Sequence, residues 1–255
     1  MENIKAILTS IEQKKNIKIL YACETGSRAW GFPSPDSDYD IRFVYMHERD
    51  WYLSLSQRKD TIEIMDGDLD ITGWDLRKCL SLLKKSNAPL IERFVSPLEY
   101  FAKAGFKNEF KTLIENYYSP TAVFYHHYSL AGKFWADIKN VNEYKLKSWF
   151  YLVRSLLSCN WIIKKKSVLP MDIEGLMTLI DEESRGKLRE LIKLKAGVGE
   201  KYLHTKNEQM NDWIEKLWIL IETSKENLGV SSPHYSLLNE FFLKKVNENA
   251  DNRTS

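Results

Sequence analysis

The start of the chain combines three hydrophobic patterns. Residues 2–14 carry apolar side chains three and four positions apart, which predicts an amphipathic helix lying on the first sheet. Residues 17–23 are apolar at nearly every position, which is typical of a central strand covered on both faces. A second strand is expected to end near Tyr45, after a turn, a short helix and a loop rich in proline and serine. Residues 17–45 therefore predict strand, glycine-serine turn, short helix, loop and strand.

The second of these strands carries two aspartates, Asp38 and Asp40. Because side chains alternate faces along a strand, both carboxylates point the same way, whereas Ile41 and Phe43 point the other way. Two like charges held close together raise each other's pKa, and a divalent cation removes this cost. Hard oxygen ligands of this kind suit Mg²⁺. The aspartate pair therefore predicts a metal site.

A hairpin signal follows. Two strand-like segments, residues 61–65 and 69–74, flank an Asp-Gly pair, which favours a tight turn between antiparallel strands. In the second arm, Asp68 and Asp70 share one face. If this arm lies beside the strand of the first two aspartates, a third carboxylate joins them. Asp75, at the end of the arm, is expected to cap the helix that comes next, which we expect to run through residue 87.

Strand signals vanish from Pro120 onward, and helical periodicity takes their place. Residues 146–163 are apolar nearly all round, which predicts a buried central helix. Further helices are expected over residues 121–139, 172–182, 184–196, 208–227 and 235–247. The fold class is therefore α+β. We place the first domain at residues 1–105 and a helical domain at residues 106–255.

Composition narrows the class of protein. The chain has 255 residues, 44% of them hydrophobic, which is typical of a folded globular protein. The formal charge of +2 means that any contact with nucleic acid must come from local basic patches. The three cysteines lie in apolar stretches and are expected to be buried free thiols. With no signal-like or membrane-spanning run, the sequence predicts a cytoplasmic protein without a membrane partner.

The backbone N–H groups around Gly26 and Ser27, at the start of a helix, are suited to hold phosphate. A phosphate site beside a metal site indicates nucleotide chemistry. The spacing of Gly26, Ser27 and Gly31, followed by Asp38 and Asp40, resembles the signature of the DNA polymerase β-like nucleotidyltransferase superfamily. The closest resemblance is to its predicted nucleotidyltransferases associated with RNA repair. It rests on GSRAWGFPSPDSDYDIRF, LDITGWDLRKCL, KSNAPLIERFVSPLEY and KLKSWFYLVRSLLSCNWI.

The resemblance implies a mixed-sheet nucleotidyltransferase domain followed by a helical domain. Role by role, it implies that Asp38 and Asp40 hold two Mg²⁺ ions, with Mn²⁺ as a substitute. For the third, catalytic and metal-binding carboxylate we favour Asp70, which lies inside a strand between two apolar residues, whereas Asp68 sits at the turn and remains its rival. Gly26 and Ser27 would bind the β- and γ-phosphates.

Two arginines are further candidates for nucleotide binding. Arg28 follows the turn directly, and Arg42 shares the face of the two aspartates, so either could meet phosphate. An arginine on the surface or in an ion pair is the alternative for each.

The expected function is nucleotidyl transfer from a nucleoside triphosphate to a hydroxyl group on an RNA end, with RNA-repair proteins as partners. Two other functions remain open from the sequence. One keeps the chemistry and changes the acceptor to a protein or small-molecule hydroxyl. The other is a non-catalytic nucleic-acid-binding module, against which stands the complete set of carboxylates, since such charges destabilise each other without a metal.

Overall fold

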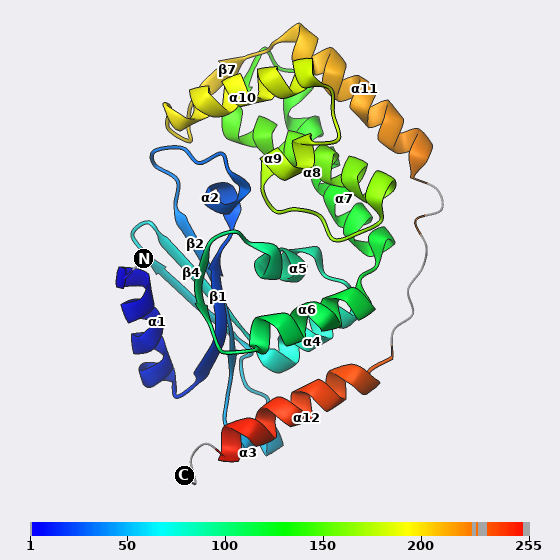
Figure 1. Ribbon diagram of the computed structural model, residues 1–255. Coiled ribbons are helices and arrows are strands. Elements are labelled where there is room, and N and C mark those ends of the chain that lie inside the picture. Colours follow the sequence, from blue (N-terminus) through cyan, green and yellow to red (C-terminus); the bar gives the residue numbers. More distant parts are fainter. Residues whose placement is uncertain (1, 226–227, 229–233, 252–255) are drawn as a thin grey trace. The chain divides into compact units, whose positions relative to one another are not determined.

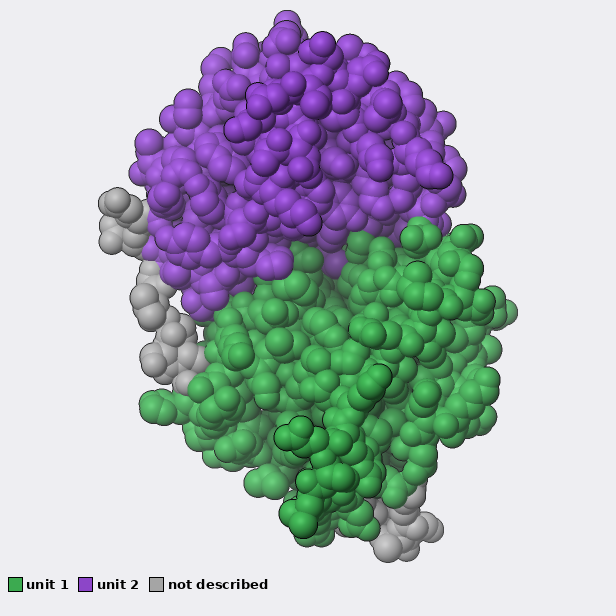
Figure 2. Space-filling model, turned by 180° about the vertical axis from the view of Figure 1, so that it is seen from behind, with its two compact units in different colours: residues 1–26, 38–118, 231–255 green, residues 27–37, 119–230 purple. Residues whose placement is uncertain are grey.

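The computed structural model describes residues 2–225, 228 and 234–251. Contacts divide the chain into two compact units, coloured separately in Figure 2. Unit 1 contains residues 1–26, 38–118 and 231–255, and unit 2 contains residues 27–37 and 119–230. The chain therefore leaves unit 1 directly after Gly26 and returns to it at Asp38. The predicted division into domains at residue 105 stays a prediction.

Unit 1 is built on a five-stranded mixed sheet in the order β3-β4-β2-β1-β5. Its strands are β1 (Lys18–Glu24), β2 (Tyr39–Met46), β3 (Thr61–Asp66), β4 (Leu69–Asp75) and β5 (Glu99–Ala102). Strands β2 and β4 pair in parallel, and the other neighbours pair antiparallel. Every residue of β1 after the first is buried, which confirms the predicted central strand.

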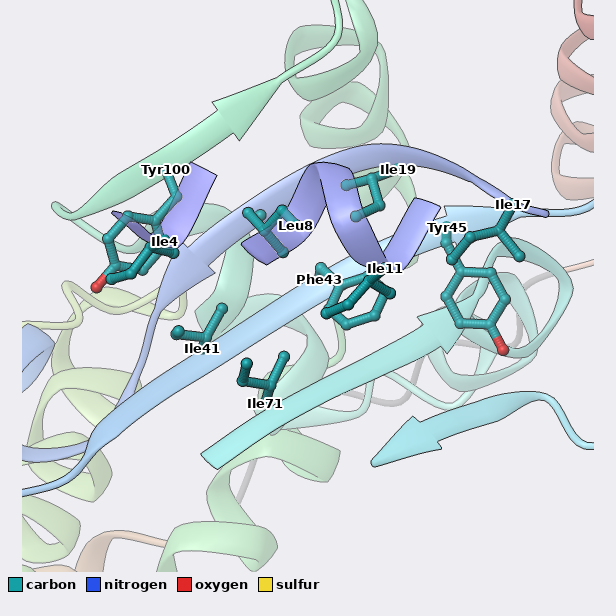
Figure 3. Close-up of a cluster of buried hydrophobic side chains, with 11 residues drawn as sticks. Ile4, Leu8, Ile11, Ile17, Ile19, Ile41, Phe43, Tyr45, Ile71 and Tyr100 are labelled. Atoms are coloured by element: carbon teal, nitrogen blue, oxygen red, sulfur yellow. The ribbon is translucent and has the colours of Figure 1, made fainter. Parts of the chain in front are cut away.

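One face of this sheet is covered by helix α1 (Glu2–Lys15) (Figure 1). Its apolar residues Ile4, Leu8 and Ile11 join a buried cluster with side chains from four strands, among them Ile41 and Phe43 (Figure 3). The amphipathic helix and its place on the sheet are therefore confirmed. Because Ile41 and Phe43 point to this face, their neighbours Asp40 and Arg42 point to the opposite one.

The opposite face of the sheet is covered by further helices of unit 1. Helices α4 (Leu76–Lys84), α5 (Ala88–Val95) and α6 (Phe106–Tyr117) contact its strands, and the ring of Phe94 lies between those of Tyr21 and Phe110. Helix α12 (Ser236–Asp251) belongs to the same unit, where Phe241 packs near Phe106 and Phe110. The ring of Phe242, also on α12, packs edge to face against the ring of Tyr52 in α3 (Arg49–Leu53).

The predicted hairpin is confirmed, since β3 and β4 pair antiparallel around Gly67, whose φ is +56°. Two details differ. The helix capped by Asp75 ends at Lys84, because Ser86 adopts a left-handed backbone conformation and a separate helix, α5, begins at Ala88. Strand β5 was not predicted, because it is only four residues long and buries only Tyr100 fully.

Unit 2 is mainly helical. Its elements are α7 (Pro120–Ile138), α8 (Leu146–Lys165), α9 (Ile173–Met177), α10 (Glu182–Ala196) and α11 (Glu208–Ser224), and α2 (Gly26–Trp30) contributes all but its first residue. Helix α8 is buried along almost its whole length and contacts α7, α9 and α11, which confirms the predicted central helix. Strands β6 (Glu143–Lys145) and β7 (Leu203–Thr205) form a small antiparallel sheet. The expectation of no strands in this half was therefore wrong, because three-residue strands leave no periodic signal.

Candidate active site

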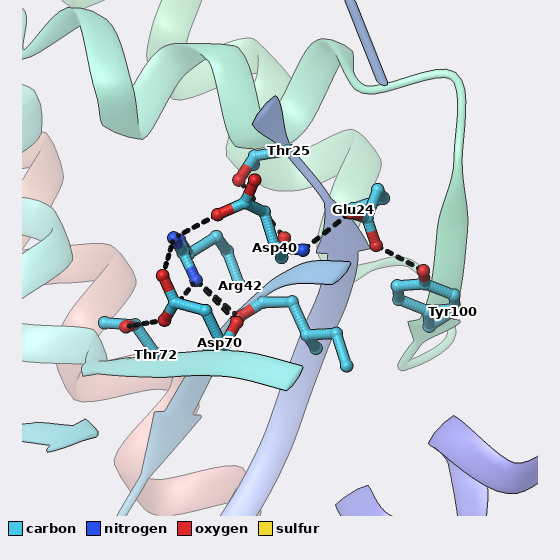
Figure 4. A network of polar contacts seen from close by, with 8 residues as sticks. Glu24, Thr25, Asp40, Arg42, Asp70, Thr72 and Tyr100 are labelled. Carbon is cyan, nitrogen blue, oxygen red and sulfur yellow. Dashed lines mark hydrogen bonds and ion pairs between the residues drawn. The ribbon is translucent and has the colours of Figure 1, made fainter. Parts of the chain in front are cut away.

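Asp40 and Asp70 lie side by side on neighbouring strands. The parallel register of β2 and β4 pairs residue 40 directly with residue 70. The second arm of the hairpin therefore lies beside the strand that carries Asp40, which is the condition under which a third carboxylate joins the site. Both side chains are partly exposed, at 26% and 31%, so solvent and ligands can reach them. In Figure 4 the carboxylates of both residues reach the same side chain, that of Arg42.

Arg42 lies between these two carboxylates (Figure 4). Its Nη2 donates to Asp40 Oδ1 at 2.8 Å and to Asp70 Oδ2 at 2.9 Å. Its Nη1 donates to Asp70 Oδ1 at 3.0 Å and to the Asp70 carbonyl at 2.7 Å. The guanidinium therefore donates hydrogen bonds to both carboxylate oxygens of Asp70 and to one of Asp40. A bidentate pair of this kind is strong and geometrically specific.

Gly26 brings the backbone of the turn against Asp40. Its φ is +63°, in the left-handed region that glycine tolerates best. A Cβ atom at this position would lie 1.9 Å from Asp40 Oδ2, so only glycine leaves room for the carboxylate. The preceding residue, Thr25, donates its N–H to the Asp40 carbonyl at 2.9 Å. The turn and the aspartate are therefore fixed to each other.

Glu24, the last residue of β1, supports the same aspartate. Its side chain is completely buried, and Oε1 accepts the N–H of Asp40 at 2.7 Å. Its Oε2 accepts a hydrogen bond from the Tyr100 hydroxyl on β5. Sequence reasoning assigned no role to Glu24. The available signal was a carboxylate at the end of an otherwise apolar strand, directly before the glycine-serine turn.

The other predicted nucleotide-binding residues, Ser27 and Arg28, belong to unit 2. Ser27 is buried, and its hydroxyl donates to Ser37 Oγ at 3.1 Å. Ser37 Oγ in turn donates to Glu200 Oε1 at 3.0 Å. Arg28 Nη2 donates to the Ser37 carbonyl at 2.7 Å. These bonds hold the loop that joins the turn to the aspartate strand.

The remaining two candidate aspartates are exposed. Asp38 directly precedes β2, which begins at Tyr39. The expectation that both aspartates lie within the strand is therefore wrong for Asp38 by one residue. Asp68 lies in the turn before β4, where its carbonyl accepts the N–H of Tyr39. Of the two rivals for the third carboxylate, Asp70 is therefore the one whose side chain meets that of Asp40 across Arg42.

Asp75 caps α4 as predicted, because its Oδ1 accepts the N–H of Arg77 at 2.8 Å. Oδ2 accepts the Tyr52 hydroxyl at 2.7 Å. The side chain is fully buried, and this burial raises the pKa of the carboxyl group to about 6 from 3.8.

Replacing Asp75 by Asn is expected to change the pH dependence of stability. Between about pH 4 and pH 6 the folded state binds a proton that the unfolded state has lost, so stability falls as pH rises through this window. Relative to Asp75→Asn, the free energy of unfolding of the wild type should fall by roughly 2.5 kcal/mol from pH 4 to pH 7. Urea unfolding at four pH values measures this difference. The exposed Asp68→Asn is the control, and a difference that stays constant with pH would contradict the expectation.

Comparison with known proteins identifies the family. A family model described as the RNA repair pathway DNA polymerase beta family, RlaP, matches residues 1–244. The chain belongs to this family. A curated relative, the uncharacterized protein YcgL of Bacillus subtilis (strain 168), is 38% identical over 245 residues, which cover 94% of each chain. The resemblance inferred from the sequence motifs is thereby confirmed, and the RlaP family points to a polymerase β-like protein of RNA repair.

The carboxylates of Asp40 and Asp70 are the groups in this site that could bind a divalent cation. Within the described ranges, no three side chains of His, Cys, Asp or Glu are grouped so as to hold a metal ion. Asp40 and Asp70, however, already direct three hard oxygens at one positive charge, the guanidinium of Arg42. Oxygens that converge on one cation fit Mg²⁺, which is bound through one or two carboxylates in phosphate-handling sites.

Two further expectations concern the whole chain. The three cysteines are free and buried, as predicted. Among helices in the described part of the chain, none combines the length and the hydropathy that a membrane span requires.

Proposed function

We propose that this RlaP-family protein is a Mg²⁺-dependent nucleotidyltransferase that moves a nucleotidyl group from a nucleoside triphosphate to a hydroxyl acceptor on an RNA end. The observation that supports this most directly is the pairing of Asp40 with Asp70 across two parallel strands, where both carboxylates meet one cation. The backbone of Gly26, at the turn, lies against the same Asp40. Carboxylates and a glycine turn are thus combined as a metal and triphosphate site requires.

In this proposal Asp40 and Asp70 are ligands of two Mg²⁺ ions, for which Mn²⁺ can substitute, and Asp38, which is not grouped with them in the structure, joins them when metal binds. Bound Mg²⁺ would neutralise triphosphate charge and lower the pKa of the acceptor hydroxyl. The chain's own contribution is positioning: Glu24 and Thr25 fix the backbone of Asp40, and Thr72 Oγ1 lies 3.4 Å from Asp70 Oδ1. Gly26 and Ser27 would present backbone N–H groups to the phosphates, with Arg28 beside them.

The family description supports RNA as the acceptor and RNA-repair proteins as partners. A cytoplasmic location is supported by three free thiols, because reducing compartments keep cysteines in this form.

Incubation of the full chain with each nucleoside triphosphate, labelled at the α-phosphate, tests the proposal when RNA with a free 3′-hydroxyl is offered together with Mg²⁺. Label is expected on RNA. The variant with both Asp38→Asn and Asp40→Asn should lose transfer while its circular dichroism stays that of the wild type. Transfer that persists in this variant would rule out the proposed metal site.

Parallel reactions offer protein or small-molecule hydroxyls in place of RNA. Label found only on these acceptors would retain the chemistry and replace the acceptor. Triphosphate binding that is independent of Mg²⁺ and without turnover would favour a non-catalytic binding module.

A further inference from the structure

Arg42 is fully engaged by the carboxylates and the backbone around it. Both protons of Nη2 are used by Asp40 Oδ1 and Asp70 Oδ2. Those of Nη1 are shared among Asp70 Oδ1 and the carbonyls of Asp70 and Ile41, at 3.0, 2.7 and 3.2 Å. The side chain is 17% exposed. In this arrangement neither terminal nitrogen has a proton left for a phosphate oxygen.

The carboxylate oxygens that accept hydrogen bonds from Arg42 are also the oxygens that would bind the proposed metal ion. Arg42 takes both carboxylate oxygens of Asp70 and one of Asp40, and the other Asp40 oxygen faces the backbone of Gly26. A divalent cation bound by Asp40 and Asp70 must therefore take oxygens from the guanidinium. Two cations that share the same ligands oppose each other's binding, both through charge and through the loss of hydrogen bonds.

We propose that Arg42 is the internal counter-ion of the candidate active site, which holds Asp40 and Asp70 together and competes with Mg²⁺ for their oxygens. This inference rests on the proposed function, since it concerns the same metal site. Arg42 is thus a positioning residue for the carboxylates. Its release by a metal ion frees two guanidinium nitrogens for a triphosphate, so metal and nucleotide should bind cooperatively.

As a counter-ion, Arg42 also allows the two carboxylates to lie in register. Without a cation, two negative charges at paired positions of adjacent strands destabilise the sheet. Arg42 supplies that cation from the same strand face as Asp40, two residues away. A neutral residue at position 42 should therefore weaken the fold when no metal is present and strengthen the binding of a divalent metal.

Arg42→Gln tests this with Mn²⁺ as the probe, measured by electron paramagnetic resonance on the full chain without nucleotide. The variant should bind Mn²⁺ roughly tenfold more tightly than the wild type, or tighter still, because one opposing charge and its hydrogen bonds are lost. Arg42→Lys keeps the charge but loses the planar fork, so its affinity should return toward that of the wild type. In EDTA, the thermal midpoint of Arg42→Gln should fall, and Mg²⁺ should raise it more than in the wild type.

Arg189→Gln is the matched control, because Arg189 also contacts two carboxylates, Glu174 and Glu182, but belongs to unit 2. It removes the same charge and should leave Mn²⁺ affinity unchanged. In the double variant Arg42→Gln with Asp70→Asn, the gain in affinity should disappear.

Three results would overturn the inference. Equal Mn²⁺ affinity of the wild type and Arg42→Gln would do so and leave the proposed function intact. Weaker binding by Arg42→Gln would show that Arg42 assists the metal instead of competing with it. Absence of Mn²⁺ binding in both proteins would overturn the inference together with the metal part of the proposed function. Circular dichroism establishes that each variant is folded.

Discussion

Replacing Gly26 by Ala should both destabilise the protein and abolish nucleotidyl transfer. The added Cβ would lie 1.9 Å from Oδ2 and 2.8 Å from Cγ of Asp40, distances that no structure sustains. The φ of +63° adds the cost of a left-handed conformation, about 1 kcal/mol for alanine. Either the turn or the carboxylate must move. We expect a loss of roughly 2–4 kcal/mol in the free energy of unfolding, measured with urea.

In Gly26→Ala, nucleotidyl transfer should fall by more than the loss of stability explains, because the displaced carboxylate, that of Asp40, is a proposed metal ligand. A shift of about 1 Å in a catalytic group is sufficient for a loss of roughly 100-fold in rate. Transfer of α-phosphate label under conditions where the variant remains folded measures this loss.

Gly67→Ala is the matched control. Gly67 has nearly the same backbone conformation, with φ of +56°, but a Cβ there would meet nothing within 4 Å. This variant should lose about 1 kcal/mol from backbone strain alone and retain full transfer. Equal effects of the two substitutions would show that strain, and not the approach of Asp40, explains the requirement for glycine at position 26.

The parts of the site that the sequence predicted are those set by local pattern. Alternation along a strand predicted that Asp40 and Ile41 point to opposite faces, and an Asp-Gly pair predicted the hairpin that carries Asp70. The structure confirms both features. The partner of Arg42 could not be predicted in the same way. Whether this arginine meets phosphate or carboxylate depends on the register of β2 with β4, which is determined by long-range packing.

The role of Glu24 illustrates the same limit. A glutamate at the end of an apolar strand marks the position as unusual, but such a residue is also compatible with solvent, so the pattern does not decide that the side chain is buried. Its partners are Asp40, sixteen residues away, and Tyr100, which lies on the strand that periodicity missed. Similarly, residues 27–37 group with the helical unit through contacts with Lys195 and Glu200, which a local pattern does not reveal.

Glu24→Ala should be among the most destabilising substitutions outside the apolar core. It removes the buried acceptor of the Asp40 N–H and of the Tyr100 hydroxyl, and it leaves a space between β1 and β5. A buried donor that loses its acceptor costs about 1–3 kcal/mol, so we expect a total loss of roughly 3–5 kcal/mol in the free energy of unfolding. Urea unfolding at neutral pH measures it.

Two milder variants separate the contributions to this effect. Glu24→Gln keeps the volume and one acceptor oxygen, so its cost should be about half that of Glu24→Ala. Tyr100→Phe removes only the hydroxyl partner, leaves the bond from Asp40 N–H in place, and should retain nucleotidyl transfer. If Glu24→Ala lost less than about 1 kcal/mol, water must replace the carboxylate. The hydrogen bond from Asp40 would then not be what positions this aspartate beside Asp70.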